Sequence, residues 1–264
     1  MRLSSALGTL LLGVTFWHIA TATATDSPTV LITGASRGIG LEFTRQYADR
    51  GWNIIATART PQDDELLQAL AAQYDNVSIE QLDVTDHAEI DAVAKKLSDQ
   101  PIDILLNNAG ISGEMENQIF GKINYDVFDD VMMINVVGPL KMSEAFIDHV
   151  AASDMKKIIN VTSGEGSIGR VQFPALYFYR SSKSALNMVM VNLARTVKDR
   201  GVTVGIIGPG LVRTDFTSYL QKLNMNLPFQ TPEESVNKYI AVIDDYGLEK
   251  SGSYLRNTGE TYPW

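Results

Sequence analysis

Near the start of the chain, one segment reads Thr33-Gly34-Ala35-Ser36-Arg37-Gly38-Ile39-Gly40. It follows an apolar run at 29–33 and precedes Leu41-Glu42-Phe43, where a helical pattern begins. Glycines at a strand-to-helix turn let the backbone approach a pyrophosphate, whose charge the helix N-terminus stabilises. The spacing is G-x-x-x-G-x-G, not the G-x-G-x-x-G of the general fingerprint, and a turn without a ligand would use the same glycines. Its place in the first strand–helix unit favours dinucleotide binding by Gly34, Ser36, Arg37, Gly38, Ile39 and Gly40.

The rest of the chain alternates short apolar runs with amphipathic stretches, the pattern of a parallel sheet covered by helices. The predicted strands are 29–33, 53–58, 77–82, 102–106, 157–162, 202–207 and 253–255. The predicted helices are 38–50, 62–73, 87–99, 125–150, 175–199 and 232–244. A chain of 264 residues can bury one large core without dividing. The sequence therefore predicts an α/β fold, a single Rossmann-type doubly wound domain whose parallel sheet has about seven strands flanked by helices.

The second predicted strand ends Ala56-Thr57-Ala58-Arg59. In NAD-binding folds an acidic residue at this strand end takes the ribose 2′-hydroxyl, and a carboxylate would repel a 2′-phosphate. Arg59, with Arg37 from the glycine turn, can instead hold a 2′-phosphate through charge-assisted hydrogen bonds. We therefore expect NADP(H) rather than NAD(H), the alternative being that both arginines are solvated surface charges.

Composition excludes several classes of function. The formal net charge of -9 argues against a nucleic-acid partner, which requires Lys and Arg gathered on one face. The chain has no cysteine, and its only histidines are His18, His87 and His149, so neither metal-ligand spacing nor a thiol nucleophile can be assembled. We expect no metal site.

The N-terminus carries an apolar stretch of its own. Arg2 precedes an apolar run at 6–20, which is followed by alternating Ala and Thr at 20–24. This pattern predicts a signal peptide at 1–24, with the folded domain at 25–264, and hence the secretory pathway lumen or an extracellular location. The alternatives are an ordinary N-terminal helix or a transit peptide, and without a signal the protein would be cytoplasmic. A stable membrane span is not expected, because the run is short and broken by Gly8, Gly13 and His18.

Several motifs together resemble the short-chain dehydrogenases/reductases. In chain order they are Thr33–Gly40, Leu82-Asp83-Val84, Asn107-Asn108-Ala109-Gly110, Tyr179–Lys183 and Pro209-Gly210. The resemblance covers about residues 29 to 264. The segment 177–187 and the ending Tyr262-Pro263-Trp264 are most similar to the carbonyl-reductase-like branch that includes sniffer. The resemblance implies hydride transfer between nicotinamide and a small-molecule carbonyl or alcohol.

Reducing a carbonyl places a hydride on carbon and a proton on oxygen, so a proton donor must lie against the developing alkoxide. Tyr179 is the expected donor, and Lys183, four residues on, shares its face of a helix. A phenol titrates near 10, and a neighbouring ammonium is expected to lower that pKa. Tyr177 would lie on the wrong side of the helix or before it, and is assigned to the substrate wall.

Ser163 follows the fifth predicted strand, at the edge where open α/β sheets hold their ligands. Its hydroxyl is expected to donate to the substrate oxygen. Thr162 and Ser167 are the rivals, one on the opposite face of the strand and the other deeper in the loop. The resemblance also implies that Asn135 holds a water between the lysine and solvent, although an interior Asn can merely satisfy a local carbonyl.

The resemblance implies further cofactor contacts. Asp83 and Val84 would meet the adenine, although Asp83 can instead cap a turn. The remaining contacts expected from the resemblance are Asn108, Ala109, Gly110, Tyr179, Lys183, Pro209, Gly210, Val212 and Thr214.

The helix after Lys183 is apolar around much of its circumference and must be buried on two sides. Its outer side suits the helix-pair interface of a homodimer or homotetramer, or a sheltering loop of the same chain. The sequence thus predicts an NADP(H)-dependent oxidoreductase, with a catalytically silent dinucleotide-binding sensor or scaffold as the alternative.

Overall fold

A computed structural model describes residues 27–223 and 226–264, so the predicted signal peptide at 1–24 lies outside the described residues. Seven strands form one parallel sheet in the order β3-β2-β1-β4-β5-β6-β7. Their bounds are β1 Thr29–Ile32, β2 Asn53–Ala58, β3 Val77–Gln81, β4 Ile104–Asn107, β5 Lys157–Val161, β6 Thr203–Gly208 and β7 Tyr254–Arg256. The predicted doubly wound fold is confirmed, and the strand order reverses at β1.

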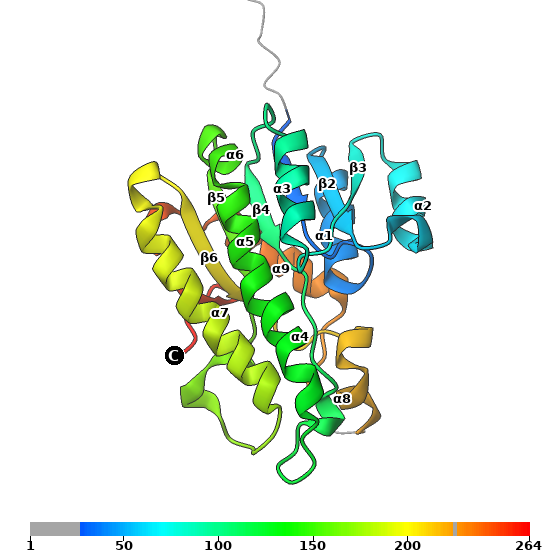
Figure 1. The fold of residues 1–264 in the computed structure, drawn as a ribbon, viewed down its shortest axis with the longest axis vertical. Helices are drawn as coiled ribbons and strands as arrows, with labels where there is room; N and C mark the ends of the chain where they lie inside the picture. Colours follow the sequence, from blue (N-terminus) through cyan, green and yellow to red (C-terminus); the bar gives the residue numbers. More distant parts are fainter. Residues whose placement is uncertain (1–26, 224–225) are drawn as a thin grey trace, which may run out of the picture.

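Helices cover both faces of the sheet, and each face has its own apolar core. Helix α1 (Gly38–Asp49), α2 (Glu65–Gln73) and α9 (Pro232–Asp244) pack on one face, through side chains such as Phe43 and Tyr239. Helix α3 (His87–Lys96), α5 (Gly138–Ala145), α6 (Ile147–Ala152) and α7 (Tyr177–Thr196) pack on the other, through side chains such as Phe146 and Leu186. In Figure 1, α3, α5 and α7 lie in front of the sheet and α9 behind it. The inner strands β1, β4 and β6 are buried on both faces and are mainly apolar, whereas the edge strand β3 is only partly buried.

The prediction of one continuous helix at 125–150 is wrong. The chain instead forms a short 3₁₀ turn at Tyr125–Val127, helix α4 (Phe128–Met132), a π-helical turn at Met133–Val137, and then α5 and α6. Side chains that repeat every three or four residues fit all of these helix types, so periodicity alone cannot detect the change. A short helix that the sequence analysis missed, α8 (Ser218–Lys222), follows β6.

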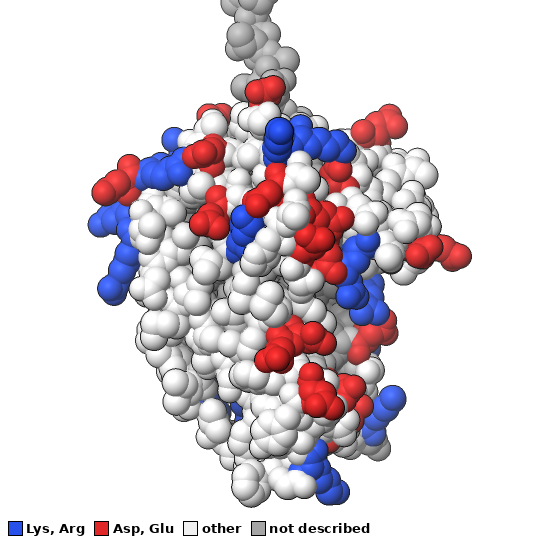
Figure 2. All heavy atoms as spheres, in the orientation of Figure 1, with Lys and Arg blue, Asp and Glu red and all other residues white. Residues whose placement is uncertain are grey.

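The surface agrees with the acidic composition. Figure 2 shows red and blue side chains intermingled over the upper part of one face, while its lower part is mostly uncharged on the left and carries red clusters toward the centre and right. Among the described residues, no helix has the length and hydrophobicity needed to cross a membrane. No group of His, Asp and Glu side chains within 27–223 and 226–264 is arranged to hold a metal ion.

Candidate active site

The predicted site residues come from the segments that follow β1, β2, β3, β4, β5 and β6, together with α7 and the π turn. Because the strands are parallel, their carboxyl ends meet at one edge of the sheet, where open α/β folds hold their ligands. The structure therefore gathers at one edge residues that are far apart in the sequence.

The glycine turn after β1 is built by close backbone contact. Gly34 has a φ of +66°, and a Cβ there would lie 2.9 Å from Cα of Ala109, at the end of β4. Gly40 is tighter still, since a Cβ would lie 2.1 Å from the Gly34 carbonyl oxygen. The turn is held by Asn108, whose Nδ2 donates to the Thr33 and Gly34 carbonyls at 2.9 and 3.0 Å. Side chains larger than hydrogen would push helix α1 away from the turn.

Helix α1 begins at this turn with its first N–H groups available. Arg37 is the N-cap residue in extended conformation, and no side chain caps the helix start. Ser36 and Ile39 lie half-buried on either side of it. From across the site, Cγ2 of Thr214 lies 3.4 Å from where a Gly38 Cβ would stand. Backbone donors and the positive end of the helix dipole thus lie beside the loop that follows β6.

Arg37 and Arg59 are both exposed at this end of the sheet. Neither forms an ion pair with an acidic residue of the described chain. Two guanidinium groups therefore stand free to bind a phosphate, which fits a cofactor with a 2′-phosphate.

Tyr179 and Lys183 lie on α7, facing Ser163 at the end of β5. Both side chains are buried, at 7% and 5% exposure. Burial raises the pKa of Tyr179 to about 12, against an opposing side-chain hydrogen bond with Ser163. Burial also lowers the pKa of Lys183 to about 8.

The expected lowering of the Tyr179 pKa by Lys183 is therefore wrong for this structure. Nζ of Lys183 lies 6.0 Å from the Tyr179 ring centroid and donates to the Val161 carbonyl at 3.0 Å. At this separation the ammonium does not offset the cost of burying a phenolate. Tyr179 is consequently a neutral phenol at physiological pH, the form that can donate a proton.

The hydroxyls of Thr162 and Ser167, the two alternatives to Ser163, donate their hydrogen bonds to other groups of the protein. The Thr162 hydroxyl donates to Oδ1 of Asn187 at 2.6 Å, and the Ser167 hydroxyl donates to the Trp264 carbonyl at 3.2 Å. Ser163 accepts the Glu165 N–H at 3.1 Å, which leaves its own proton to donate. Its carbonyl in turn accepts the Tyr254 hydroxyl. The Ser163 hydroxyl is hydrogen-bonded to Tyr179.

Asn135 lies fully buried in the π turn. Its side chain accepts from the Ile111 N–H and donates to the Ile111 carbonyl, both at 2.9 Å, and it donates to the Ser182 hydroxyl at 3.0 Å. Oδ1 lies 3.2 Å from where a Gly110 Cβ would stand, and Nζ of Lys183 lies 3.6 Å from the same point. The side chain thus satisfies local backbone groups beside Lys183, and the relay role stays a prediction.

Asp83 and Val84, the two residues expected to contact the adenine, each make contacts within the folded chain. Asp83 Oδ1 accepts from the Thr85 N–H and hydroxyl at 2.9 and 2.8 Å, so Asp83 does cap a turn. Val84 is buried against Gly138. Their contact with adenine remains a prediction.

The loop after β6 is held by Gln230 and by Thr217, whose hydroxyl donates to the Val212 carbonyl at 2.6 Å. Leu211 accepts the Gln230 N–H at 2.9 Å, and Arg213 donates to the Gln230 carbonyl at 2.9 Å, which holds Val212 between them. Gly210 has a φ of +79°, and Pro209 accepts the Ser235 hydroxyl at 2.7 Å. The loop is therefore rigid where it approaches the glycine turn.

Some residues near the phenol carried no signal in the sequence. Met115, Leu176 and Phe216 pack against Tyr179, the Phe216 ring centroid lying 5.5 Å from that of Tyr179. They come from three separate segments, so no local pattern marks them. Gln118 and Tyr254, which hold the backbones of Tyr179 and Ser163, were likewise missed.

Comparison with known proteins agrees with this geometry. A sequence model of the family described as short chain dehydrogenase matches residues 28–224. The chain belongs to this family of oxidoreductases. It is 32% identical over 239 residues to the 1-hydroxy-2-glutathionyl-2-methyl-3-butene dehydrogenase of a Rhodococcus species, which covers 89% of this chain and 99% of that protein.

Two solved structures of carbonyl reductases superpose on the chain. The NADPH-bound carbonyl reductase from chicken fatty liver superposes with a TM-score of 0.80 at 30% identity, over 90% of this chain and 100% of that one. The carbonyl reductase Sniffer of D. melanogaster superposes with a TM-score of 0.78 over the same shares, at 23% identity, which shows the shared fold. The resemblance expected from the sequence is confirmed.

Proposed function

We propose that this protein is an NADP(H)-dependent carbonyl reductase that interconverts a small ketone or aldehyde with its alcohol. The observation that carries the proposal is a buried Tyr179 phenol, hydrogen-bonded to Ser163 and one helical turn from Lys183. This group of side chains lies at the same edge of the sheet as the glycine turn and as Arg37 and Arg59, which form no ion pair within the described chain. The cofactor-bound carbonyl reductase that superposes on the chain supports NADP(H).

The residues of the glycine turn fit the cofactor. Backbone N–H groups at the start of α1 would hold its pyrophosphate, and Arg37 and Arg59 its 2′-phosphate. Asn108, Ala109 and Gly110 would border the adenosine ribose, and Val212 and Thr214 the carboxamide. When bound, NADPH supplies the hydride.

Side chains of the protein bind the substrate oxygen and supply its proton. Ser163 and Tyr179 donate hydrogen bonds to the carbonyl oxygen, which polarises the bond and fixes its direction. As hydride reaches the carbon, the phenol proton moves to the oxygen and yields the alcohol. The Lys183 ammonium stabilises the phenolate that is left, and Asn135 supports proton resupply. Alcohol oxidation is the same path reversed.

An assay of the purified protein tests the function. NADPH absorbance is followed with a panel of aldehydes and ketones, and NADPH binding is measured separately by fluorescence. We expect turnover with at least one carbonyl compound. Tight NADPH binding without turnover on any of them would favour a cofactor sensor or scaffold instead.

We also propose that the protein is exported after removal of residues 1–24. The support is the Arg2, apolar run and small-residue sequence alone. Expression of the full chain in a secreting host, with mass spectrometry of the mature N-terminus, tests this. An intact Met1 in the purified intracellular protein would contradict it.

Self-association through the outer side of α7 and α4–α5 is a further part of the proposal. Met188, Leu140 and Phe128 are exposed there, at 66%, 41% and 38%. Large exposed apolar side chains on adjacent helices favour burial against a second copy. A mass measurement by light scattering, with Met188→Lys as the disrupting variant, decides between monomer and oligomer.

A further inference from the structure

The start of α7, which carries Tyr179, lacks a cap from its own sequence. The first four N–H groups of a helix have no partner within the helix. Leu176 occupies the N-cap position with a φ of 59° and offers no side-chain acceptor. The end is also buried, since Phe178 and Tyr179 are only 8% and 7% exposed. An acceptor must therefore come from elsewhere in the fold.

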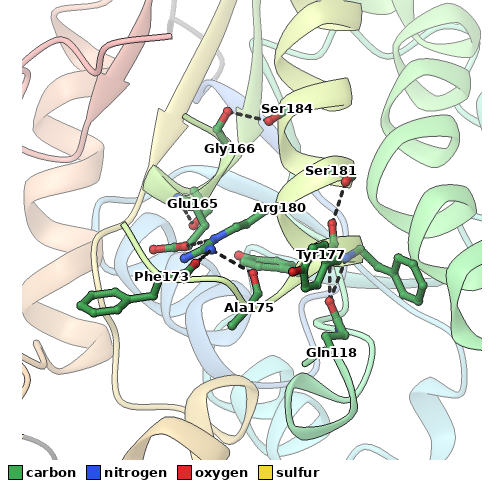
Figure 3. A network of polar contacts seen from close by, with 12 residues as sticks. Gln118, Glu165, Gly166, Phe173, Ala175, Tyr177, Arg180, Ser181 and Ser184 are labelled. Carbon is green, nitrogen blue, oxygen red and sulfur yellow. Dashed lines mark hydrogen bonds and ion pairs between the residues drawn. The ribbon is translucent and has the colours of Figure 1, made fainter. Parts of the chain in front are cut away.

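Gln118 supplies that acceptor from the segment between β4 and α4. Its Oε1 accepts the N–H groups of Phe178 and Tyr179, both at 3.0 Å, and its backbone carbonyl accepts the Leu176 N–H at 3.0 Å. Figure 3 shows Gln118 beneath the first turn of α7, with the dashed contacts running into it. The side chain is completely buried.

The amide nitrogen of the Gln118 side chain also forms hydrogen bonds. Nε2 donates to the Ser112 carbonyl at 2.7 Å and to the Gly113 carbonyl. Gly113 packs closely against α4, because a Cβ there would lie 2.3 Å from Cγ2 of Val131. Gln118 thus joins this loop to the helix start through two donated and two accepted bonds, which only an amide of this length provides.

We infer that Gln118 is a positioning residue for the reaction: its amide fixes the first turn of α7 and so the place of the Tyr179 phenol relative to Ser163. Gln118 touches the Tyr179 backbone and acts on the chemistry only through it. This inference rests on the proposed function, because it concerns the placement of its proton donor. A displacement of the reacting group by about 1 Å can lower a rate about 100-fold.

Two variants separate the amide's roles. Gln118→Met keeps the length of the side chain and removes all four bonds, so we expect kcat to fall about 10- to 100-fold. Gln118→Glu keeps the acceptor but, when ionised, directs negative charge at two carbonyl oxygens. When protonated it can donate one bond and accept the others. Relative to wild type, the Glu variant should therefore gain activity as the pH is lowered, and the Met variant should not.

The measurements exclude a merely structural explanation. NADPH affinity should stay within about threefold of wild type in both variants at a temperature where each is folded. Labelling with 3-fluorotyrosine, with the Tyr179 ¹⁹F signal assigned by its loss in Tyr179→Phe, should show that signal shifted in Gln118→Met. Gln73→Met, the same change at an exposed position of α2, is the matched control.

The inference is overturned if Gln118→Met keeps kcat within twofold with an unmoved ¹⁹F signal. If Gln118→Met does not fold, the test rests on Gln118→Glu. A ratio of Gln118→Glu activity to wild-type activity that stays constant with pH also overturns the inference. Failure of the function itself looks different, because wild type would then reduce no carbonyl while the ¹⁹F shift could still appear.

Discussion

Asn108 closes the turn at Gly34 from a neighbouring strand, with Nδ2 donating to the carbonyls of Thr33 and Gly34 at 2.9 and 3.0 Å. The same residue's N–H donates to the Thr33 hydroxyl at 3.0 Å. The conformation that presents backbone donors to a pyrophosphate is therefore held by β4, more than seventy residues away in the sequence. The strength of cofactor binding should depend on this contact.

Asn108→Asp replaces the donor with an acceptor that faces two carbonyl oxygens. We expect the free energy of unfolding to fall by about 1–3 kcal/mol and the NADPH dissociation constant to rise about tenfold or more. Thermal unfolding and fluorescence titration measure the two effects. Asn237→Asp, the same substitution at an exposed position of α9, should change neither. Unchanged NADPH binding in Asn108→Asp would contradict the account.

Arg59→Asp should change the cofactor preference. The guanidinium lies at the end of β2 without an ion-pair partner in the described chain, and a carboxylate there would repel a 2′-phosphate. The ratio of NADPH to NADH affinity should fall about 10- to 100-fold, since charge-assisted bonds to phosphate are among the stronger ones. Arg195→Asp, in the last turn of α7, makes the same change of net charge away from the cofactor site and is the control. A ratio that does not move would refute the role given to Arg59.

Tyr179→Phe removes only the hydroxyl that is expected to donate the proton. We expect kcat to fall about 10²- to 10⁴-fold, the usual contribution of general acid catalysis, with NADPH affinity nearly unchanged. Single-turnover kinetics with saturating NADPH measure the chemical step directly. Tyr74→Phe, the same change at the end of α2 and outside the proposed site, is the matched control and should keep its activity. Equal rates in Tyr179→Phe and wild type would refute the proton donor.

The buried titratable pair predicts the direction of the pH profile. Tyr179, with its pKa raised to about 12, stays protonated across the working range, while Lys183, lowered to about 8, loses its proton above that pH. The ammonium stabilises the phenolate formed during reduction, so kcat for reduction should be level near pH 6–7 and fall as the pH rises through about 8. Alcohol oxidation, which needs the phenolate, should instead rise with pH.

Lys183→Arg tests which group causes the falling limb. A guanidinium does not lose its proton in this range, so whatever activity this variant keeps should no longer fall near pH 8. Profiles for wild type and variant are measured at constant ionic strength with saturating NADPH. An identical falling limb in both proteins would assign it to another group.

The fold could be read from the sequence because its signals are local. The inner strands of the sheet, such as β1 and β4, are short buried apolar runs, and glycines mark the turn after β1, where only a residue without Cβ fits. Tyr179 and Lys183 could also be paired in advance, since four residues on a helix fix which side chains share a face. The helix between β4 and β5 was predicted less well, because α-helical and π-helical turns share nearly the same periodicity.

Other features depended on contacts between distant segments. The direction of the Tyr179 pKa was wrong in the sequence analysis because the cost of burying a charge is set by neighbours such as Met115 and Phe216, from other parts of the chain. The cap that Gln118 places on α7 is likewise invisible locally, since about sixty residues separate it from Tyr179. Sequence alone therefore determined the sheet and the glycine turn and predicted the candidate catalytic side chains. Tertiary structure decided their protonation and support, because desolvation and long-range hydrogen bonds exist only once the chain has folded.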